Sequence, residues 1–258
     1  MLLAVDVGNS ETTLGLFDGD ALRAHWRLTT TATRTADEAR VLVTQLVRSG
    51  GIDPAGVTAV SLCSVVPPVT PGLVTALDVA FGVTPIVVDA ASPLPISLDV
   101  DEPMSVGADR VVNTLAASQI YKRDCIVVDL GTATTYDCIS AEGSFFGGII
   151  QPGVKTSAQM LFDKTALLPS TVLATPTHAI ATNTIDCIRA GVVYGAADSI
   201  DGLIRRVKGE WPRPNAPYVV ATGGLSSTFR PFCAEFDEVD PALTLKGLRL
   251  AHLLLSND

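Results

Sequence analysis

Two short polar motifs of the chain combine residue types that bind nucleotide phosphates. The first, DVGNSETT, occupies residues 6–13, and the second, DLGTATT, occupies residues 129–135. In each motif a glycine lets backbone N–H groups approach a phosphate, hydroxyl and amide side chains are donors, and the leading aspartate can hold a hydrated metal ion. These residue types favour binding of a nucleoside triphosphate together with its metal.

Neither motif matches the two common nucleotide-binding fingerprints. The chain has no G-x-x-x-x-G-K-[ST] loop and no G-x-G-x-x-G that opens a helix, which argues against the P-loop and Rossmann folds. A single Asp-x-Gly turn after an apolar strand is also a common structural turn. Two copies at domain-length spacing, each followed by a Thr-rich strand, indicate an internal duplication instead.

A third motif, VGADR at residues 106–110, places a potential base beside a cation. Asp109 could accept the proton of an attacking hydroxyl, and Arg110 could grip a carboxylate or a phosphate. In isolation the same two residues could equally form an ordinary salt bridge.

Two further glycine turns could contact a ligand through the backbone. In ATGGLSS, Gly223 and Gly224 would let a flat group such as adenine lie against the backbone, and a plain strand-to-helix connection explains them equally well. The sequence GGIIQPG, residues 147–153, is predicted to be a loop ahead of a helix that contacts the substrate or only positions that helix.

The elements around these motifs alternate between strands and helices. Apolar spacing predicts helices over residues 36–47, 159–168, 184–207 and 245–255, and strands over residues 57–64 and 216–224, besides the strand pairs at the two motifs. We therefore expect an α/β protein of two domains, residues 1–117 and 118–258, which face each other across a cleft.

Composition restricts the partners of the chain. A formal charge of −9 without a Lys/Arg cluster would repel a nucleic acid backbone, and no stretch of 18 apolar residues suggests a membrane span. The five cysteines are scattered without a C-x-x-C pair and the three histidines are isolated, which argues against disulfides, a zinc site and a Ser-His-Asp triad. We expect a cytoplasmic protein with reduced thiols.

Taken in chain order, the motifs resemble those of the type III pantothenate kinases over nearly the whole chain. The similar blocks are DVGNS, WRLTTTATRTADE, CSVVPP, VGADR, DLGTATTYD, GGIIQPG, KTALLP, the NT of ATNT, AGVVYG and ATGG. The resemblance implies ATP-dependent phosphorylation of pantothenate to 4′-phosphopantothenate, the first step of coenzyme A biosynthesis.

The resemblance also implies residue roles. Asp109 would be the catalytic proton acceptor, Asp129 a ligand of a monovalent cation, and Asp6 a water-mediated ligand of Mg²⁺. The implied ATP-binding residues are Asp6, Val7, Gly8, Asn9, Ser10, Glu11, Thr12, Thr13 and Thr132. The implied pantothenate-binding residues are Val100, Gly107, Ala108, Asp109, Arg110 and Thr184.

The same resemblance implies an actin-like fold of two ribonuclease H-like domains, in the superfamily of acetate kinase and the sugar kinases. It further implies Mg²⁺ with ATP, activation by K⁺ or NH₄⁺, and a homodimer whose interface helps to build the pantothenate pocket.

The chain departs from the family pattern on the substrate side. Val100 stands where the family usually has tyrosine, which removes a contact worth roughly 1 kcal/mol. Ala181 and Thr182 replace the usual glycine and a following lysine or arginine. These changes motivate one alternative, a weakly active or inactive nucleotide-binding regulator resembling the Bvg accessory factors. Another is a phosphohydrolase of the same superfamily, in which water would attack in place of an alcohol.

Overall fold

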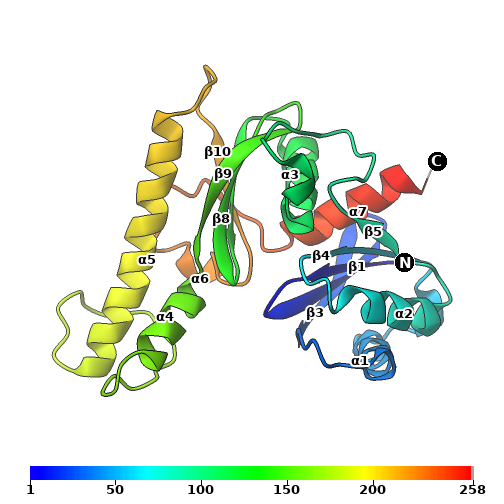
Figure 1. The fold of residues 1–258 in the computed structure, drawn as a ribbon, viewed down its shortest axis with the longest axis horizontal. Coiled ribbons are helices and arrows are strands. Elements are labelled where there is room, and N and C mark those ends of the chain that lie inside the picture. Colours follow the sequence, from blue (N-terminus) through cyan, green and yellow to red (C-terminus); the bar gives the residue numbers. More distant parts are fainter. Residues whose placement is uncertain (257–258) are drawn as a thin grey trace. The chain divides into compact units, whose positions relative to one another are not determined.

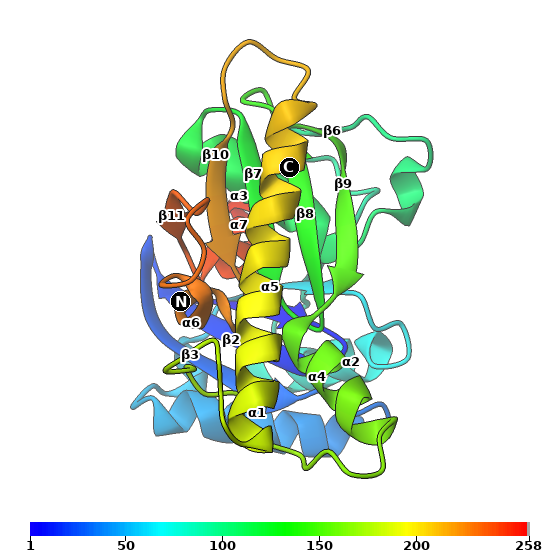
Figure 2. The same ribbon diagram turned by 90° about the vertical axis from the view of Figure 1, so that its left-hand side faces the viewer.

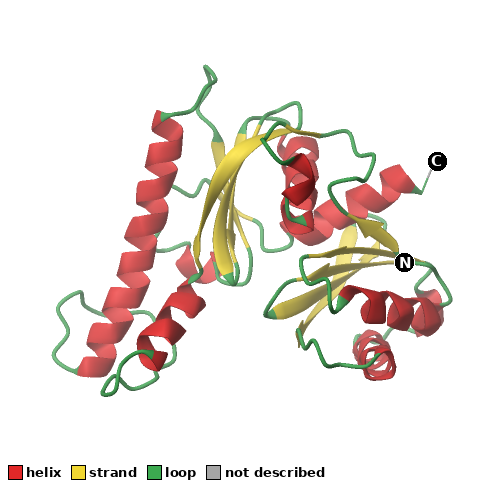
Figure 3. Cartoon of the chain, viewed as in Figure 1, coloured by secondary structure: helices red, strands yellow, loops and turns green. Residues whose placement is uncertain are grey.

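The computed structural model describes residues 1–256, and these form two compact units. The first unit contains residues 1–121, 142–145 and the C-terminal segment from Ala242, and the second contains residues 122–141 and 146–241. Helices and strands occur in both units, which makes the chain a mixed α/β protein (Figures 1 and 3). The division into domains 1–117 and 118–258 stays a prediction.

The first unit is built on a sheet with the strand order β3-β2-β1-β4-β5, counted over residues 1–256. Strand β1 pairs antiparallel with β2 and parallel with β4, and β4 pairs parallel with β5. The strands of this sheet are β1 (Leu2–Val7), β2 (Glu11–Asp18), β3 (Ala21–Thr29), β4 (Ala59–Ser64) and β5 (Ile86–Val88).

Helices cover both faces of this first sheet. Alternate residues of β1, among them Leu3 and Val5, pack with the buried faces of α1 (Ala36–Ser49) and α2 (Thr70–Phe81). The intervening residues Leu2 and Ala4 pack with α3 (Ala108–Tyr121) and α7 (Leu243–Leu255), which also contact each other. Helix α1 begins after Thr35, whose hydroxyl and the side chain of Glu38 form a capping box.

The second unit repeats the arrangement with the order β9-β8-β7-β10-β11 within the part of the chain described. Strand β7 pairs antiparallel with β8 and parallel with β10, and β10 pairs parallel with β11. Its strands are β7 (Cys125–Leu130), β8 (Ala133–Ile139), β9 (Ser144–Pro152), β10 (Tyr218–Thr222) and β11 (Glu238–Val239).

The long helix α5 (Thr184–Gly209) runs along one face of the second sheet, as Figure 2 shows. Its buried residues, including Ala197 and Ile200, pack with Ile126 and Val128 of β7. Helices α4 (Val154–Asp163) and α6 (Ser226–Phe229) contribute to the same core. The first residues of β9, Ser144 and Phe145, belong to the first unit, where they pair with β6 (Ser97–Leu98).

The shared strand order and directions support the internal duplication that the two motifs predict, since each motif lies between the first and second strands of its unit. Helix α1 and helix α5 match their predicted ranges to within two residues. Two local predictions were wrong. Residues 147–152 belong to β9 and not to a loop, and the helix expected over 159–168 lies at Val154–Asp163. No helix within residues 1–256 has the length and apolar character needed to cross a bilayer.

Candidate functional site

The first polar motif forms a tight turn between β1 and β2. The N–H of Gly8 donates to the carbonyl of Glu11 at 3.0 Å, and Asp6 lies opposite Thr13 in the antiparallel pair. A Cβ atom at residue 8 would lie 3.0 Å from the Glu11 carbonyl oxygen, closer than side chains normally tolerate. A side chain at this position would therefore require the turn to shift by a few tenths of an ångström. Asn9, Ser10 and Glu11 are exposed at its tip.

Asp6, at the end of β1, is one of two acidic residues that interact in the first unit. Burial, together with repulsion from Asp109, raises the pKa of Asp6 from 3.8 to about 7. Burial also raises the pKa of Asp109, although the N–H of Arg110 donates to Asp109 Oδ1 at 2.8 Å and opposes the shift. Two carboxylates that repel each other in a partly dry site favour binding of a cation.

Cys63, a fully buried residue of β4, contacts this acidic pair. Its thiol donates to Asp6 Oδ1 at 3.4 Å. Burial and the negative charge of Asp6 and Asp109 raise the pKa of the thiol well above its usual range. The thiol therefore stays protonated as a weak donor, and it is not a nucleophile.

The chemistry of the acidic pair fits a divalent cation. Magnesium-like ions prefer oxygen ligands and usually keep several waters when one or two carboxylates bind them. Arg110 is the cation that acts on this pair, through Asp109, whereas the pKa of Asp6 is shifted by burial, by Asp109 and by its bond to Cys63. Asp6 and Asp109 are the residues of the first unit that would face such an ion.

The VGADR motif forms the beginning of α3. The carbonyl of Gly107 accepts from the N–H groups of Arg110 and Val111, which places Asp109 in the first helical turn. A Cβ atom at residue 107 would lie 2.7 Å from Asp109 Oδ1 and would displace that carboxylate. The guanidinium of Arg110 lies over the ring of Phe145, 4.8 Å from its centroid. The charge of Arg110 nevertheless acts on Asp109, since it opposes the rise in the pKa of that carboxyl.

The second polar motif forms the matching turn between β7 and β8. The N–H of Gly131 donates to the carbonyl of Ala133 at 3.0 Å, as Gly8 does in the first turn. The carbonyl of Thr132 accepts from the N–H of Gly153 at 3.1 Å and from the Thr156 hydroxyl at 2.7 Å. A side chain at residue 153 would collide with this carbonyl. The start of α4 is therefore packed directly on the second turn.

The ATGG turn meets the same end of the second sheet. Gly223 has φ of +86°, and a Cβ atom there would collide with the carboxylate of Asp129 and lie 2.7 Å from the N–H nitrogen of Leu130. Glycine at this position allows close packing of the β10 turn against the end of β7. The structure thus brings Asp129, the second turn and the glycine turn together in one unit.

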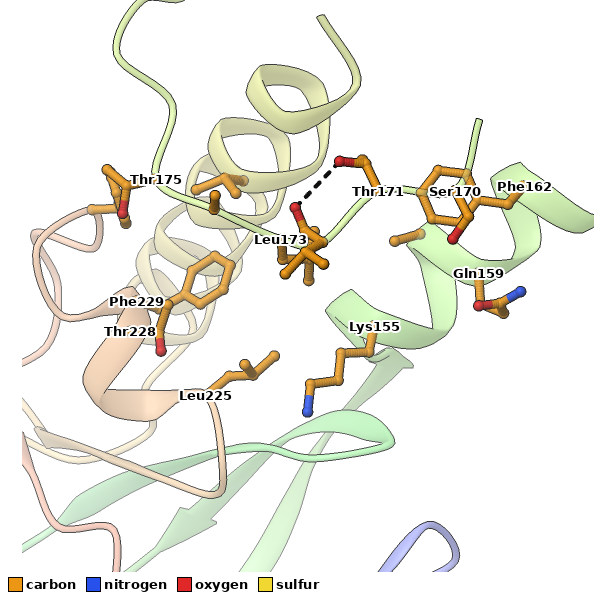
Figure 4. Close-up of a pocket in the computed structure, with 15 residues that line it drawn as sticks. Lys155, Gln159, Phe162, Ser170, Thr171, Leu173, Thr175, Leu225, Thr228 and Phe229 are labelled. Atoms are coloured by element: carbon orange, nitrogen blue, oxygen red, sulfur yellow. Dashed lines mark hydrogen bonds between the residues drawn. The ribbon is translucent and has the colours of Figure 1, made fainter. Parts of the chain in front are cut away.

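A pocket of about 390 Å³ opens beside this glycine turn (Figure 4). Leu225, Thr228 and Phe229 line it from α6 and the preceding loop, and Lys155 lines it from α4. Its remaining walls come from α5, from α4, from Phe232 after α6, and from residues 170–175, a segment without helix or strand between α4 and α5 (Figure 3). The mainly apolar walls with a few hydroxyl groups and one cation suit a flat heterocycle attached to an anion.

The remaining predicted residues lie as follows. Val100 is half-buried and follows β6 in the first unit. Thr184 is exposed at the first position of α5 in the second unit, after Asn183, whose side chain caps the helix by accepting from the N–H of Asp186. The first unit therefore holds residues 6–13, Val100 and residues 107–110, and the second holds Asp129, Thr132 and Thr184.

Sequence reasoning missed three residues that contact the predicted site. Cys63 donates to Asp6, Phe145 lies against Arg110, and Thr30 bonds to the first turn. Cys63 and Thr30 fall inside the CSVVPP and WRLTTTATRTADE blocks, which offered a signal that these segments approach the site. Nothing in the local pattern marks Phe145.

Comparisons with known proteins identify the family of the chain. The family model for type III pantothenate kinase matches residues 2–206. The type III pantothenate kinase of Anaeromyxobacter sp. (strain Fw109-5) is 45% identical over 252 residues, 98% of each chain.

Solved structures share the fold. One, described as a Baf family transcriptional activator from Campylobacter jejuni, has a TM-score of 0.61 at 18% identity and covers 99% of this chain and 100% of that one. Component A of (R)-2-hydroxyglutaryl-CoA dehydratase from Acidaminococcus fermentans has a TM-score of 0.56 at 16% identity, with 98% and 96% covered. Identities this low show the fold alone.

The protein has the fold of the actin-like ATPases and sugar kinases, with two ribonuclease H-like sheets, as predicted. The chain belongs to the type III pantothenate kinase family. This confirms the family and the enzyme class, a kinase, that the motifs predict. A kinase of this family uses ATP with a divalent metal ion.

Proposed function

We propose that this chain transfers the γ-phosphoryl group of ATP to the primary hydroxyl of pantothenate, the first step of coenzyme A biosynthesis. The observation that carries the proposal is the pair of interacting carboxyl groups of Asp6, near the end of β1, and Asp109, in the first turn of α3. Family membership over nearly the full chain supports the same reaction.

In this proposal Asp109 accepts the proton of the attacking hydroxyl. Burial raises its pKa, which makes its carboxylate a stronger proton acceptor than an exposed aspartate. The N–H of Arg110 holds Oδ1, which leaves the other oxygen, Oδ2, to face the acceptor. Arg110, fixed against Phe145, would bind the carboxylate of pantothenate, with Val100, Gly107, Ala108 and Thr184 as the further contacts.

The ATP phosphates would lie against the two turns, residues 6–13 and Thr132. Phosphoryl transfer depends mainly on positioning and on stabilising charge, and turns with fixed backbone groups provide both. A bound Mg²⁺ would neutralise phosphate charge, and Asp6 would hold it through water. Asp129 would bind K⁺ or NH₄⁺. The pocket lined by Leu225, Phe229 and Lys155 would take the adenine.

We also propose a homodimer, with the cytoplasm as its setting. Large apolar side chains are exposed in one stretch of the second unit, and exposed apolar surface of this kind favours protein contacts. The most exposed of them lie in the segment that leads to Thr184: Leu167 at 91%, Val172 at 79% and Ile180 at 89%. Light scattering on the purified protein would test the dimer.

The reaction is tested with purified protein, ATP, Mg²⁺ and pantothenate, with and without K⁺. We expect 4′-phosphopantothenate by mass spectrometry, and its loss in Asp109→Asn while ADP binding by calorimetry is retained. Phosphate release without pantothenate would indicate a hydrolase. ADP binding without any product would indicate a regulator, and either result would refute the kinase proposal.

A further inference from the structure

Thr30, the residue after β3, makes three hydrogen bonds to the turn at residues 8–12. Its N–H donates to the carbonyl of Ser10 at 2.9 Å. Its hydroxyl donates to the carbonyl of Gly8 at 2.7 Å and lies 2.9 Å from the hydroxyl of Thr12. One residue outside the polar motif therefore contacts the turn at three points.

The direction of each bond follows from the number of protons available. A threonine hydroxyl has a single proton, and a carbonyl oxygen can only accept. The proton of Thr30 is used by the carbonyl of Gly8, so the bond between the two hydroxyl groups is donated by Thr12. The proton of Thr12, a residue only 4% exposed, is therefore committed to Thr30 and is not available to a phosphate.

These bonds decide which groups of the turn face away from Thr30. In a planar trans peptide the C=O and the following N–H point in opposite directions. Because the carbonyls of Gly8 and Ser10 point at Thr30, the N–H groups of Asn9 and Glu11 point away from it. A rotated peptide would present a carbonyl oxygen where a phosphate oxygen must approach, and the two would repel each other.

We propose that Thr30 is a positioning residue for the ATP phosphates, and that Thr12 acts through Thr30 instead of on the nucleotide. This inference rests on the proposed function, because it takes the turn at residues 8–12 as a phosphate-binding turn. It assigns to Thr30 a role in ATP affinity and none in acceptor binding or proton transfer.

The test compares Thr30→Val with Thr30→Ser. Valine has nearly the shape of threonine and removes both hydroxyl bonds, whereas serine keeps them. We expect Thr30→Val to raise the KM for ATP and the Kd for ADP about ten-fold, with kcat and the KM for pantothenate within about two-fold. Thr30→Ser is expected to restore ADP affinity to within about two-fold of the unmodified chain.

Two further variants refine the test. Thr12→Val should weaken ADP binding, and it should add little when combined with Thr30→Val, because both changes break the same chain of bonds. Thr44→Val is the matched control, since the Thr44 hydroxyl also donates to a carbonyl, that of Arg40 in α1. It should leave ADP binding unchanged.

Three results would overturn the proposal: ADP binding by Thr30→Val equal to that of the unmodified chain, equal weakening in Thr30→Ser, or a rise in both KM values together with a lower Tm. The last would indicate a general structural role. Failure of the unmodified chain to bind ADP would instead refute the proposed function, and this inference with it.

Discussion

The substitution Asp6→Asn should stabilise the ligand-free protein while it abolishes the kinase reaction. Burial and Asp109 raise the pKa of Asp6 from 3.8 to about 7. Each tenfold change in proton affinity is worth about 1.4 kcal/mol, so ionised Asp6 lowers the free energy of unfolding by up to ~4 kcal/mol at pH 8. The side chain is only half-buried, so solvent screening reduces the expected effect to ~2 kcal/mol.

Because the pKa of Asp6 is raised on folding, the stabilisation by Asp6→Asn has a distinct pH dependence. The folded protein holds the Asp6 proton up to about pH 7, whereas the unfolded chain releases it near 3.8. Stability is therefore lost as the pH rises from about 4 to 7 and changes little above that range. The advantage of Asp6→Asn should be full at pH 8 and less than half as large at pH 5.

Thermal unfolding in EDTA at pH 5 and pH 8 measures the difference in stability between Asp6→Asn and the unmodified chain. At about 2–4 °C per kcal/mol for a protein of this size, Asp6→Asn should raise the Tm by about 4–8 °C at pH 8. Asp18→Asn is the control, because Asp18 is exposed and pairs with the exposed Arg23, and the Tm of this variant should change by less than about 2 °C. A Tm for Asp6→Asn equal to or below that of the unmodified chain at pH 8, or a gain that is the same at both pH values, would refute the reasoning.

Three other predictions follow from the geometry. Gly223→Ala should lower the free energy of unfolding in urea by about 2–4 kcal/mol, because its Cβ would collide with Asp129 at a left-handed φ, and a loss below about 1 kcal/mol would contradict this. Phe145→Leu removes the ring beneath Arg110, so it should raise the KM for pantothenate about three- to ten-fold and leave the KM for ATP unchanged. An equal rise in both constants would contradict this prediction. A thiol reagent should modify one cysteine of the native protein, Cys187, because the other four are buried, and all five after denaturation. Rapid reaction of a second thiol in the native protein would be inconsistent with the fold.

The sequence predicts best what depends on local pattern. The two Asp-x-Gly turns were placed correctly between strand pairs because apolar runs and glycine punctuation are local signals. The same rules failed at residues 147–152, where glycine suggested a loop. There β9 lies beside β8, and Pro152 is its last residue, where a missing N–H matters least.

The contacts that complete the site were not predictable, because they depend on register. Thr30 reaches Gly8 only because β2 and β3 pair with a shift between Leu16 and Phe17. A shift of one residue moves every following side chain to the other face of a strand, and no local pattern in the chain announces it. The approach of Phe145 to Arg110 likewise depends on the pairing of β6 with β9, two strands far apart in the sequence.

Each of the two turns has a carbonyl group that accepts a hydrogen bond from a threonine outside the polar motif. Thr30 directly follows β3 and donates to the carbonyl of Gly8, whereas Thr156 is in the first turn of α4 and donates to the carbonyl of Thr132, both at 2.7 Å. Strand β3 is the third strand counted from β1 in the first sheet, and β9 is the third counted from β7 in the second. If the two turns bind the ATP phosphates as we propose, each hydroxyl holds a carbonyl oxygen that would otherwise repel a phosphate. Two turns of different sequence, GNSE and GTAT, therefore each have a carbonyl group bound by a threonine hydroxyl, which comes from the residue after β3 in the first unit and from α4 in the second.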